Sequence, residues 1–187
     1  RRVNGDGIAP LDAPEGWSSA TLATLLAEVE VRTIVFSDTT TLLVAEDGLY
    51  RHDAPGDTWT LIRSTGDLWA LAYSQGRFWL GGNGTFEYSD DAGSTWISAY
   101  NDLYSLIGRS LLINQIIADG ERVAVKPGNR SILFSTDGGV SWNNILFKGE
   151  TTGAASLSMD LKNPRILYAA MWQHQRYPTN LHPRRSI

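Results

Sequence analysis

Short runs of apolar, β-branched and aromatic residues recur along the chain, and turn-forming dipeptides such as Asp47-Gly48 and Asn83-Gly84 separate them. Runs of this length and composition predict β-strands joined by tight turns. The runs fall into groups of four that repeat about every forty residues, a period typical of stacked sheet repeats. We therefore expect an all-β chain of four-stranded antiparallel sheets. The expected sheets span residues 30–64, 65–101 and 110–147, with a partial one at 154–175.

One segment, residues 18–29, departs from the strand pattern. Leu22, Leu25, Leu26 and Val29 recur at helical spacing behind a serine that can cap a helix. The spacing predicts one short amphipathic helix. Such a helix serves either as a connector packed on the sheets or as a docking element for another chain.

Two eight-residue segments, Ser89–Trp96 and Ser135–Trp142, share the pattern Ser-x-Asp-x-Gly-x-Thr/Ser-Trp. Each follows a predicted strand. In an Asp-x-Gly turn the carboxylate accepts backbone N–H groups a few residues on, and the glycine takes a positive φ. The tryptophan supplies a large apolar plate for packing. We expect a structural role for Ser89, Asp91, Gly93, Trp96, Ser135, Asp137, Gly139 and Trp142.

This pattern resembles the Asp-box, or BNR, repeat. The resemblance implies a β-propeller whose four-stranded sheets are its blades. Residues 52–59, His52 to Trp59, form a degenerate first copy that keeps the glycine and the Thr-Trp end. The family includes sialidases, xyloglucan-type glycoside hydrolases, sortilin-type receptors and non-catalytic assembly factors. The resemblance thus implies an architecture and leaves the activity open.

The resemblance covers most of residues 1–187, which we expect to form a single repeat domain. The partial unit at 154–175 begins like a blade of sortilin-like proteins. Two arrangements fit: the N-terminal segment closes a small ring, or the chain is part of a larger propeller. The second is favoured, with the remaining blades coming from another chain segment or from self-association.

The composition limits which classes of partner and ligand we expect this chain to bind. The net charge is −4 and the isoelectric point about 5.3, which disfavours nucleic acid because phosphate binding needs a concentrated basic face. No apolar run has the length of a membrane span, so we expect no membrane insertion. With no cysteine and three scattered histidines, no metal site and no cofactor are expected. No signal peptide is visible; the family resemblance implies an extracellular or periplasmic location.

Catalytic patterns are not evident. A glycoside hydrolase needs two carboxylates flanking the scissile bond, one of them protonated. Most carboxylates here lie beside glycine or threonine in predicted turns. The Arg-Ile-Pro motif of sialidases is missing from this sequence. A fragment of a secreted sialidase- or xyloglucanase-like hydrolase remains the alternative hypothesis.

Binding residues are easier to nominate. Trp172, His174, Arg176 and Tyr177 cluster where the last predicted strand runs into a loop, a position from which scaffolds present ligand groups. We interpret this cluster as the first candidate for ligand binding. The leading hypothesis is a non-catalytic binding or scaffold module that engages a protein or a glycan through its loops.

Overall fold

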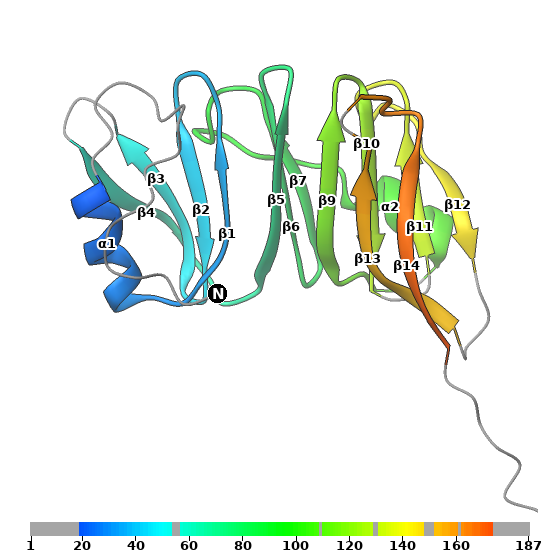
Figure 1. Ribbon diagram of the computed structural model, residues 1–187, viewed down its shortest axis with the longest axis horizontal. Coiled ribbons are helices and arrows are strands. Elements are labelled where there is room, and N and C mark those ends of the chain that lie inside the picture. The colour runs from blue at the N-terminus through cyan, green and yellow to red at the C-terminus, as the bar shows by residue number, and fades with distance from the viewer. Residues whose placement is uncertain are drawn as a thin grey trace, which may run out of the picture.

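The computed structural model describes residues 19–53, 57–108, 110–128, 131–147, 152–160 and 162–173. Its strands form three four-stranded antiparallel sheets and one two-stranded sheet, which we call blades 1 to 4 (Figure 1). Within each blade the strands are ordered as in the sequence. Blade 1 contains β1 (Val31–Phe36), β2 (Thr41–Ala45), β3 (Gly48–Asp53) and β4 (Thr58–Ser64). Blade 2 contains β5 (Leu68–Ser74), β6 (Arg77–Gly82), β7 (Thr85–Ser89) and β8 (Ile97–Ser98). Blade 3 contains β9 (Ile113–Asp119), β10 (Arg122–Pro127), β11 (Ser131–Ser135) and β12 (Asn143–Phe147). Blade 4 contains β13 (Thr152–Met159) and β14 (Leu167–Gln173).

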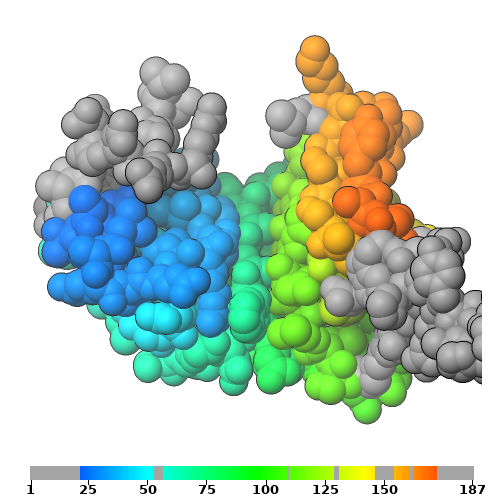
Figure 2. Space-filling model, turned by 60° about the horizontal axis from the view of Figure 1, so that its bottom comes forward, coloured from blue at the N-terminus to red at the C-terminus, as the bar shows by residue number. Residues whose placement is uncertain are grey.

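The blades stand side by side along an arc. Their first strands, β1, β5, β9 and β13, contact one another in that order and form the inner side of the arc. Figure 2 shows the hollow that this arc leaves between the first and last blades. The predicted arrangement of all-β, four-stranded antiparallel blades, three full and one partial, is confirmed.

The core lies between the blades. Leu42 and Val44 of β2 pack against Leu71 and Leu80 of blade 2. A larger cluster joins blades 2 and 3 around Trp79, and a smaller one joins blades 3 and 4 around Leu157. Each buried leucine-sized side chain contributes about 1.5–3 kcal/mol of hydrophobic free energy. Each blade thus depends on its neighbour for much of its burial, as in other repeat folds.

The predicted helix is confirmed as α1 (Ser19–Glu28). Its Leu25 is buried against Leu43 and Tyr50, on the face of blade 1 that none of the other described blades covers. Figure 1 shows the helix on the outer side of that blade. α1 therefore acts as a connector that caps the described end of the arc.

A second helix, α2 (Tyr100–Ile107), was not predicted. The expected last strand of blade 2 reached residue 101, but β8 ends at Ser98. Leu103 of α2 is fully buried in the core between blades 2 and 3, and Gly108 ends the helix in the left-handed conformation. The expected strand is therefore wrong at its last residues, where the chain turns into a helix whose Leu103 fills the core between blades 2 and 3.

Candidate functional site

The loop after β7 is held together by its own side chains. The Ser89 hydroxyl donates to Asp91 Oδ1 (2.7 Å) and accepts the Gly93 N–H (2.8 Å). Asp91 also accepts the Thr95 N–H at Oδ1 (2.8 Å) and the Thr95 hydroxyl at Oδ2 (2.6 Å). Trp96 Nε1 donates back to the Gly93 carbonyl (3.1 Å). The loop thus satisfies its polar groups internally.

The loop after β11 makes the same bonds. Ser135 donates to Asp137 Oδ1 (2.7 Å) and accepts the Gly139 N–H (2.9 Å). Asp137 accepts the Ser141 N–H (2.9 Å) and the Ser141 hydroxyl (2.5 Å). Trp142 Nε1 donates to the Gly139 carbonyl (3.0 Å). The repeated sequence pattern therefore corresponds to a repeated turn in three dimensions.

Both turn carboxylates have a lowered pKa. The hydroxyl and N–H of Thr95, with the Ser89 hydroxyl, lower the pKa of Asp91 to about 2. Ser141 and Ser135 lower the pKa of Asp137 to about 2 in the same way. Hydrogen bonds to the ionised form cause both shifts. A general acid needs the opposite shift, so these groups are suited to structure.

These pKa shifts predict a loss of stability in acid. The unfolded value is 3.8, so both carboxylates stabilise the fold above that pH, and the contribution fades as pH falls toward about 2. We expect urea unfolding at pH 3 to show a lower free energy than at pH 6. Asp137→Asn should shrink this difference, because asparagine cannot be protonated in that range. An unchanged difference in the variant would contradict the assignment.

Each turn also docks onto the preceding blade. A methyl group added at Gly93 would lie 3.1 Å from Leu42 of blade 1, and one at Gly139 would lie 2.3 Å from Trp79 of blade 2. Trp142 packs edge-on against Trp79, with ring centroids 6.0 Å apart. The turns therefore join neighbouring blades as well as neighbouring strands.

The degenerate first copy uses other residues. His52 Nε2 lies 2.9 Å from Asp57 Oδ1, and the His52 ring lies 5.1 Å from that of Trp59. His52 is 5% exposed. The middle of this turn, residues 54–56, lies outside the described residues. In this copy a histidine–aspartate contact replaces the serine–aspartate hydrogen bond of the other two copies.

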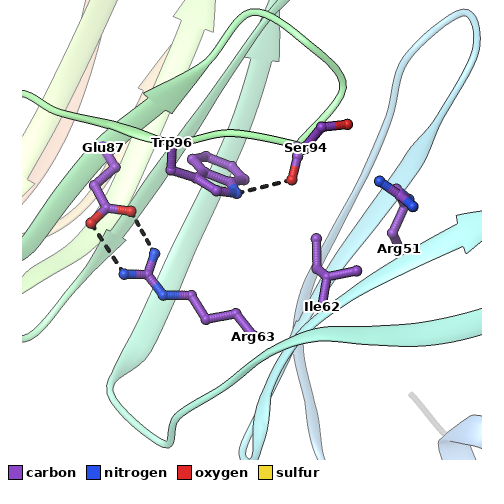
Figure 3. Close-up of a pocket in the computed structure, with 7 residues that line it drawn as sticks. Arg51, Ile62, Arg63, Glu87, Ser94 and Trp96 are labelled. Atoms are coloured by element: carbon purple, nitrogen blue, oxygen red, sulfur yellow. Dashed lines mark hydrogen bonds and ion pairs between the residues drawn. The ribbon is translucent and has the colours of Figure 1, made fainter.

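A pocket of about 280 Å³ opens between blades 1 and 2 beside the first regular turn (Figure 3). Its lining residues are Arg51, Ile62, Arg63, Glu87, Gly93, Ser94 and Trp96. Arg63 of β4 donates to both oxygens of Glu87 of β7, at 2.5 and 3.2 Å. This bidentate pair raises the pKa of Arg63. Glu87 is the one carboxylate among the described lining residues, and both of its oxygens accept hydrogen bonds from Arg63.

The Arg63–Glu87 pair should couple blades 1 and 2. The Arg63 side chain is 37% exposed and that of Glu87 17%, so solvent weakens the attraction. A double-mutant cycle with Arg63→Met and Glu87→Gln is expected to give a coupling of about 0.5–1 kcal/mol. The coupling should fall as salt rises. Zero coupling, or coupling that salt leaves unchanged, would show that the pair does not join the blades.

A second pocket, of about 480 Å³, opens between blades 2 and 3. Arg77 is one of its lining residues: Nε and Nη2 donate to Asp90 (2.6 and 2.8 Å), and Nη1 donates to the Gly138 carbonyl (2.9 Å). The guanidinium also lies 4.1 Å from the Tyr88 ring centroid. The ion pair lowers the pKa of Asp90. This arginine therefore clamps one blade to the turn of the next.

The side chains of the predicted ligand-binding cluster all lie outside the described part of the chain. Trp172 lies in β14, but its side chain is outside the described part of the chain. His174, Arg176 and Tyr177 lie outside the described residues altogether. Their role stays a prediction.

Sequence reasoning missed the contacts that Arg63 and Arg77 make between neighbouring blades. Arg63 and Glu87 are 24 positions apart, and Arg77 and Gly138 are 61 apart. No local spacing connects residues so distant.

Among the described residues, no cluster of three or more His, Cys, Asp or Glu is placed to hold a metal ion. None of the described helices has the length and apolarity needed to cross a membrane.

Neither a protein-family model nor a curated protein matches this sequence. Solved structures do. An ancestral GH74 enzyme aligns with 86% of this chain and 22% of its own length (TM-score 0.59, 14% identity). YCF48 bound to a D1 peptide aligns with 72% of this chain and 45% of its own (TM-score 0.51, 15% identity). The extracellular domain of a two-component system protein from B. thetaiotaomicron aligns with 74% of this chain and 19% of its own length (TM-score 0.57, 14% identity).

The fold is of the β-propeller type. At these identities the likeness shows the fold alone. The chain spans less than half the length of each of these three proteins. An enzyme and a peptide-bound protein share the architecture, so the activity has to be argued from the side chains.

Proposed function

We propose that this chain belongs to an Asp-box β-propeller that acts as a non-catalytic, extracytoplasmic module for binding a protein or a glycan. The observation that carries this proposal is that these carboxylates are ion-paired or bound within turns. Glu87 is ion-paired, Asp90 is ion-paired, and Asp91 and Asp137 are bound within turns. Every described carboxyl group with a shifted pKa is shifted downward. A hydrolase would need a protonated carboxyl group near neutral pH.

The two regular turns support the Asp-box assignment through their shared hydrogen bonds. The location outside the cytoplasm follows from the family resemblance, and one structural neighbour is itself an extracellular domain. Because the chain covers a minor share of its neighbours, we further propose that its ring is completed by additional blades. Those blades come from another segment or from a second copy.

The partner should engage the loops that join the strands, including the sequence-predicted cluster of Trp172, His174, Arg176 and Tyr177. A peptide and glycan array probed with the purified 187-residue chain tests this. We expect specific array binding that Arg176→Ala with Tyr177→Ala weakens at least tenfold. Tyr168→Ala, an exposed aromatic on the same strand as Trp172, is the matched control.

Hydrolysis is tested in parallel with xyloglucan and sialyllactose as substrates. Release of reducing ends or sialic acid should not exceed the buffer rate. Turnover that Glu87→Gln abolishes would overturn the non-catalytic proposal in favour of a glycoside hydrolase. Array binding that the Arg176→Ala, Tyr177→Ala double variant leaves unchanged would show that the ligand binds outside the predicted cluster.

A further inference from the structure

The pocket between blades 2 and 3 is walled by three turns that hydrogen-bond to one another. The Ser74 hydroxyl, in the turn between β5 and β6, donates to the Gly120 carbonyl in the turn between β9 and β10 (3.1 Å). The Gly138 N–H of the loop after β11 donates to the Glu121 carbonyl (2.8 Å). Arg77 Nη1, back at the first turn, donates to the Gly138 carbonyl (2.9 Å). All five residues line the pocket, so its wall is a closed ring of hydrogen-bonded turns at the upper end of the blades in Figure 1.

This wall is built before any ligand arrives, which lowers the entropy that binding has to overcome. The pocket also offers apolar surface at two depths. Trp79 and Val123 line it and are buried, whereas Val140 lines it and is 83% exposed. An exposed valine loses contact with water when a ligand covers it, and this burial favours binding. The apolar part of a ligand can therefore lie against Val140, above the buried base.

The charges of the pocket select a cation. Its described ionisable lining residues are Arg77, Asp90, Glu121 and Asp137. Asp90 offsets the charge of Arg77 through their ion pair. Asp137 accepts hydrogen bonds from the uncharged Ser135 and Ser141, which keep it ionised without cancelling its charge. Two negative charges, those of Glu121 and Asp137, therefore remain, and a recess lined by one sign of charge attracts the opposite sign.

Two side chains of the lining have acceptor atoms to spare. Neither the Glu121 carboxylate nor the Gln75 amide bonds to any residue that the structure describes, and both residues are exposed. An added Cβ at Gly120 would lie 3.6 Å from Gln75 Nε2, so the Gln75 side chain reaches from blade 2 to the turn that carries Glu121. A carboxylate and an amide oxygen on facing turns can share one donor group that carries several N–H bonds.

An arginine side chain fits these features better than other cations do. Its planar guanidinium presents five N–H donors, enough for a carboxylate and an amide oxygen together. Its aliphatic stem suits the exposed face of Val140. A metal ion fits less well, because the described carboxylates form no cluster of three that could hold one. A neutral glycan would gain nothing from the negative charge of the pocket.

We propose that this pocket binds an arginine side chain of a partner protein, with the guanidinium on Glu121 and Gln75 and the stem against Val140. The inference rests on the proposed binding function and names a basic protein segment as its ligand. The residues of this pocket are distinct from those of the sequence-predicted cluster, so the two surfaces can be tested separately.

NMR titration of the isotope-labelled chain with a short peptide that contains one central arginine tests the inference. We expect the amide signals of Gly76, Gly120 and Gly138 to shift, because these glycines line the pocket. A peptide with citrulline in place of arginine has nearly the same shape without the charge. It should bind about tenfold more weakly, since charge-assisted hydrogen bonds are the stronger ones. Affinity for the arginine peptide should also fall as salt rises.

Glu121→Gln should weaken binding of the arginine peptide by about tenfold and reduce its preference over the citrulline peptide. Glu30→Gln is the matched control, because it removes the same charge from an exposed position outside the pocket. The control should bind like the unaltered chain. Thermal unfolding of both variants checks that they are folded.

Three outcomes would overturn the inference. The arginine peptide may leave the three glycine signals unmoved, or the citrulline peptide may bind equally well. Capped free arginine that binds as tightly as the peptide would instead assign the pocket to a small cation. Array binding that depends on Arg176 and Tyr177 but not on Glu121 would keep the proposed function in each of these cases.

Discussion

Replacing Gly139 with alanine is expected to lower the free energy of unfolding by about 2–5 kcal/mol. The new methyl group would lie 2.3 Å from Cη2 of Trp79, a contact that forces the core between blades 2 and 3 to move. Overpacking of this kind costs about 1–3 kcal/mol. Gly139 also has a φ of +88°, where a Cβ adds about 1–2 kcal/mol of backbone strain. Urea denaturation followed by tryptophan fluorescence measures the loss.

Gly138 is the matched control for this substitution. It neighbours Gly139 and has a φ of +68°, but nothing lies within 4 Å of an added methyl group. Gly138→Ala should therefore cost only the backbone strain of about 1–2 kcal/mol. Equal losses at the two positions would show that the contact between the turn and Trp79 is not tight.

Truncating Trp142 to alanine is expected to cost about 3–5 kcal/mol, the range for removing a large aromatic side chain from a core. Trp142 is 8% exposed and packs edge-on against Trp79 and Phe86, with centroids 6.0 and 5.4 Å apart. Its indole N–H also ties the turn closed through the Gly139 carbonyl. The substitution should therefore loosen both the turn and the joint between blades 2 and 3.

Trp69→Ala provides the comparison, because it removes the same side chain from an exposed position. Trp69 is 43% exposed, and its main partner is the Arg32 guanidinium. Loss of that cation–π contact should cost about 1 kcal/mol. If chemical denaturation gave similar losses for the two variants, the interblade role of Trp142 would be wrong.

The turns were predictable because their chemistry is local. Asp91 and Thr95 are four residues apart, and so are Asp137 and Ser141, so the spacing alone brings the carboxylate to the N–H and the hydroxyl. The alternation of strand runs and turn dipeptides was local in the same sense. The short helix α1 followed from its leucine spacing.

Other features depend on packing between distant segments. α2 begins in a stretch that looked like a strand, and the burial of Leu103 between blades 2 and 3 selects the helix. Trp69 lies between two buried residues of β5, Leu68 and Ala70, yet it is 43% exposed at the bulge. Register shifts of this kind arise from pairing between strands, which a single strand's sequence does not encode.

By itself, the sequence determined the blade period, the two hydrogen-bonded turns and the all-β class, because each depends on residues close together in the chain. Only the tertiary structure decided which charges are neutralised. It paired Arg63 with Glu87 and Arg77 with Asp90, and it left Arg32 of β1 without a carboxylate partner among the described residues. The physical reason is that local bonds form wherever the residues occur, whereas the partner of a charge is set by how distant strands and blades come together.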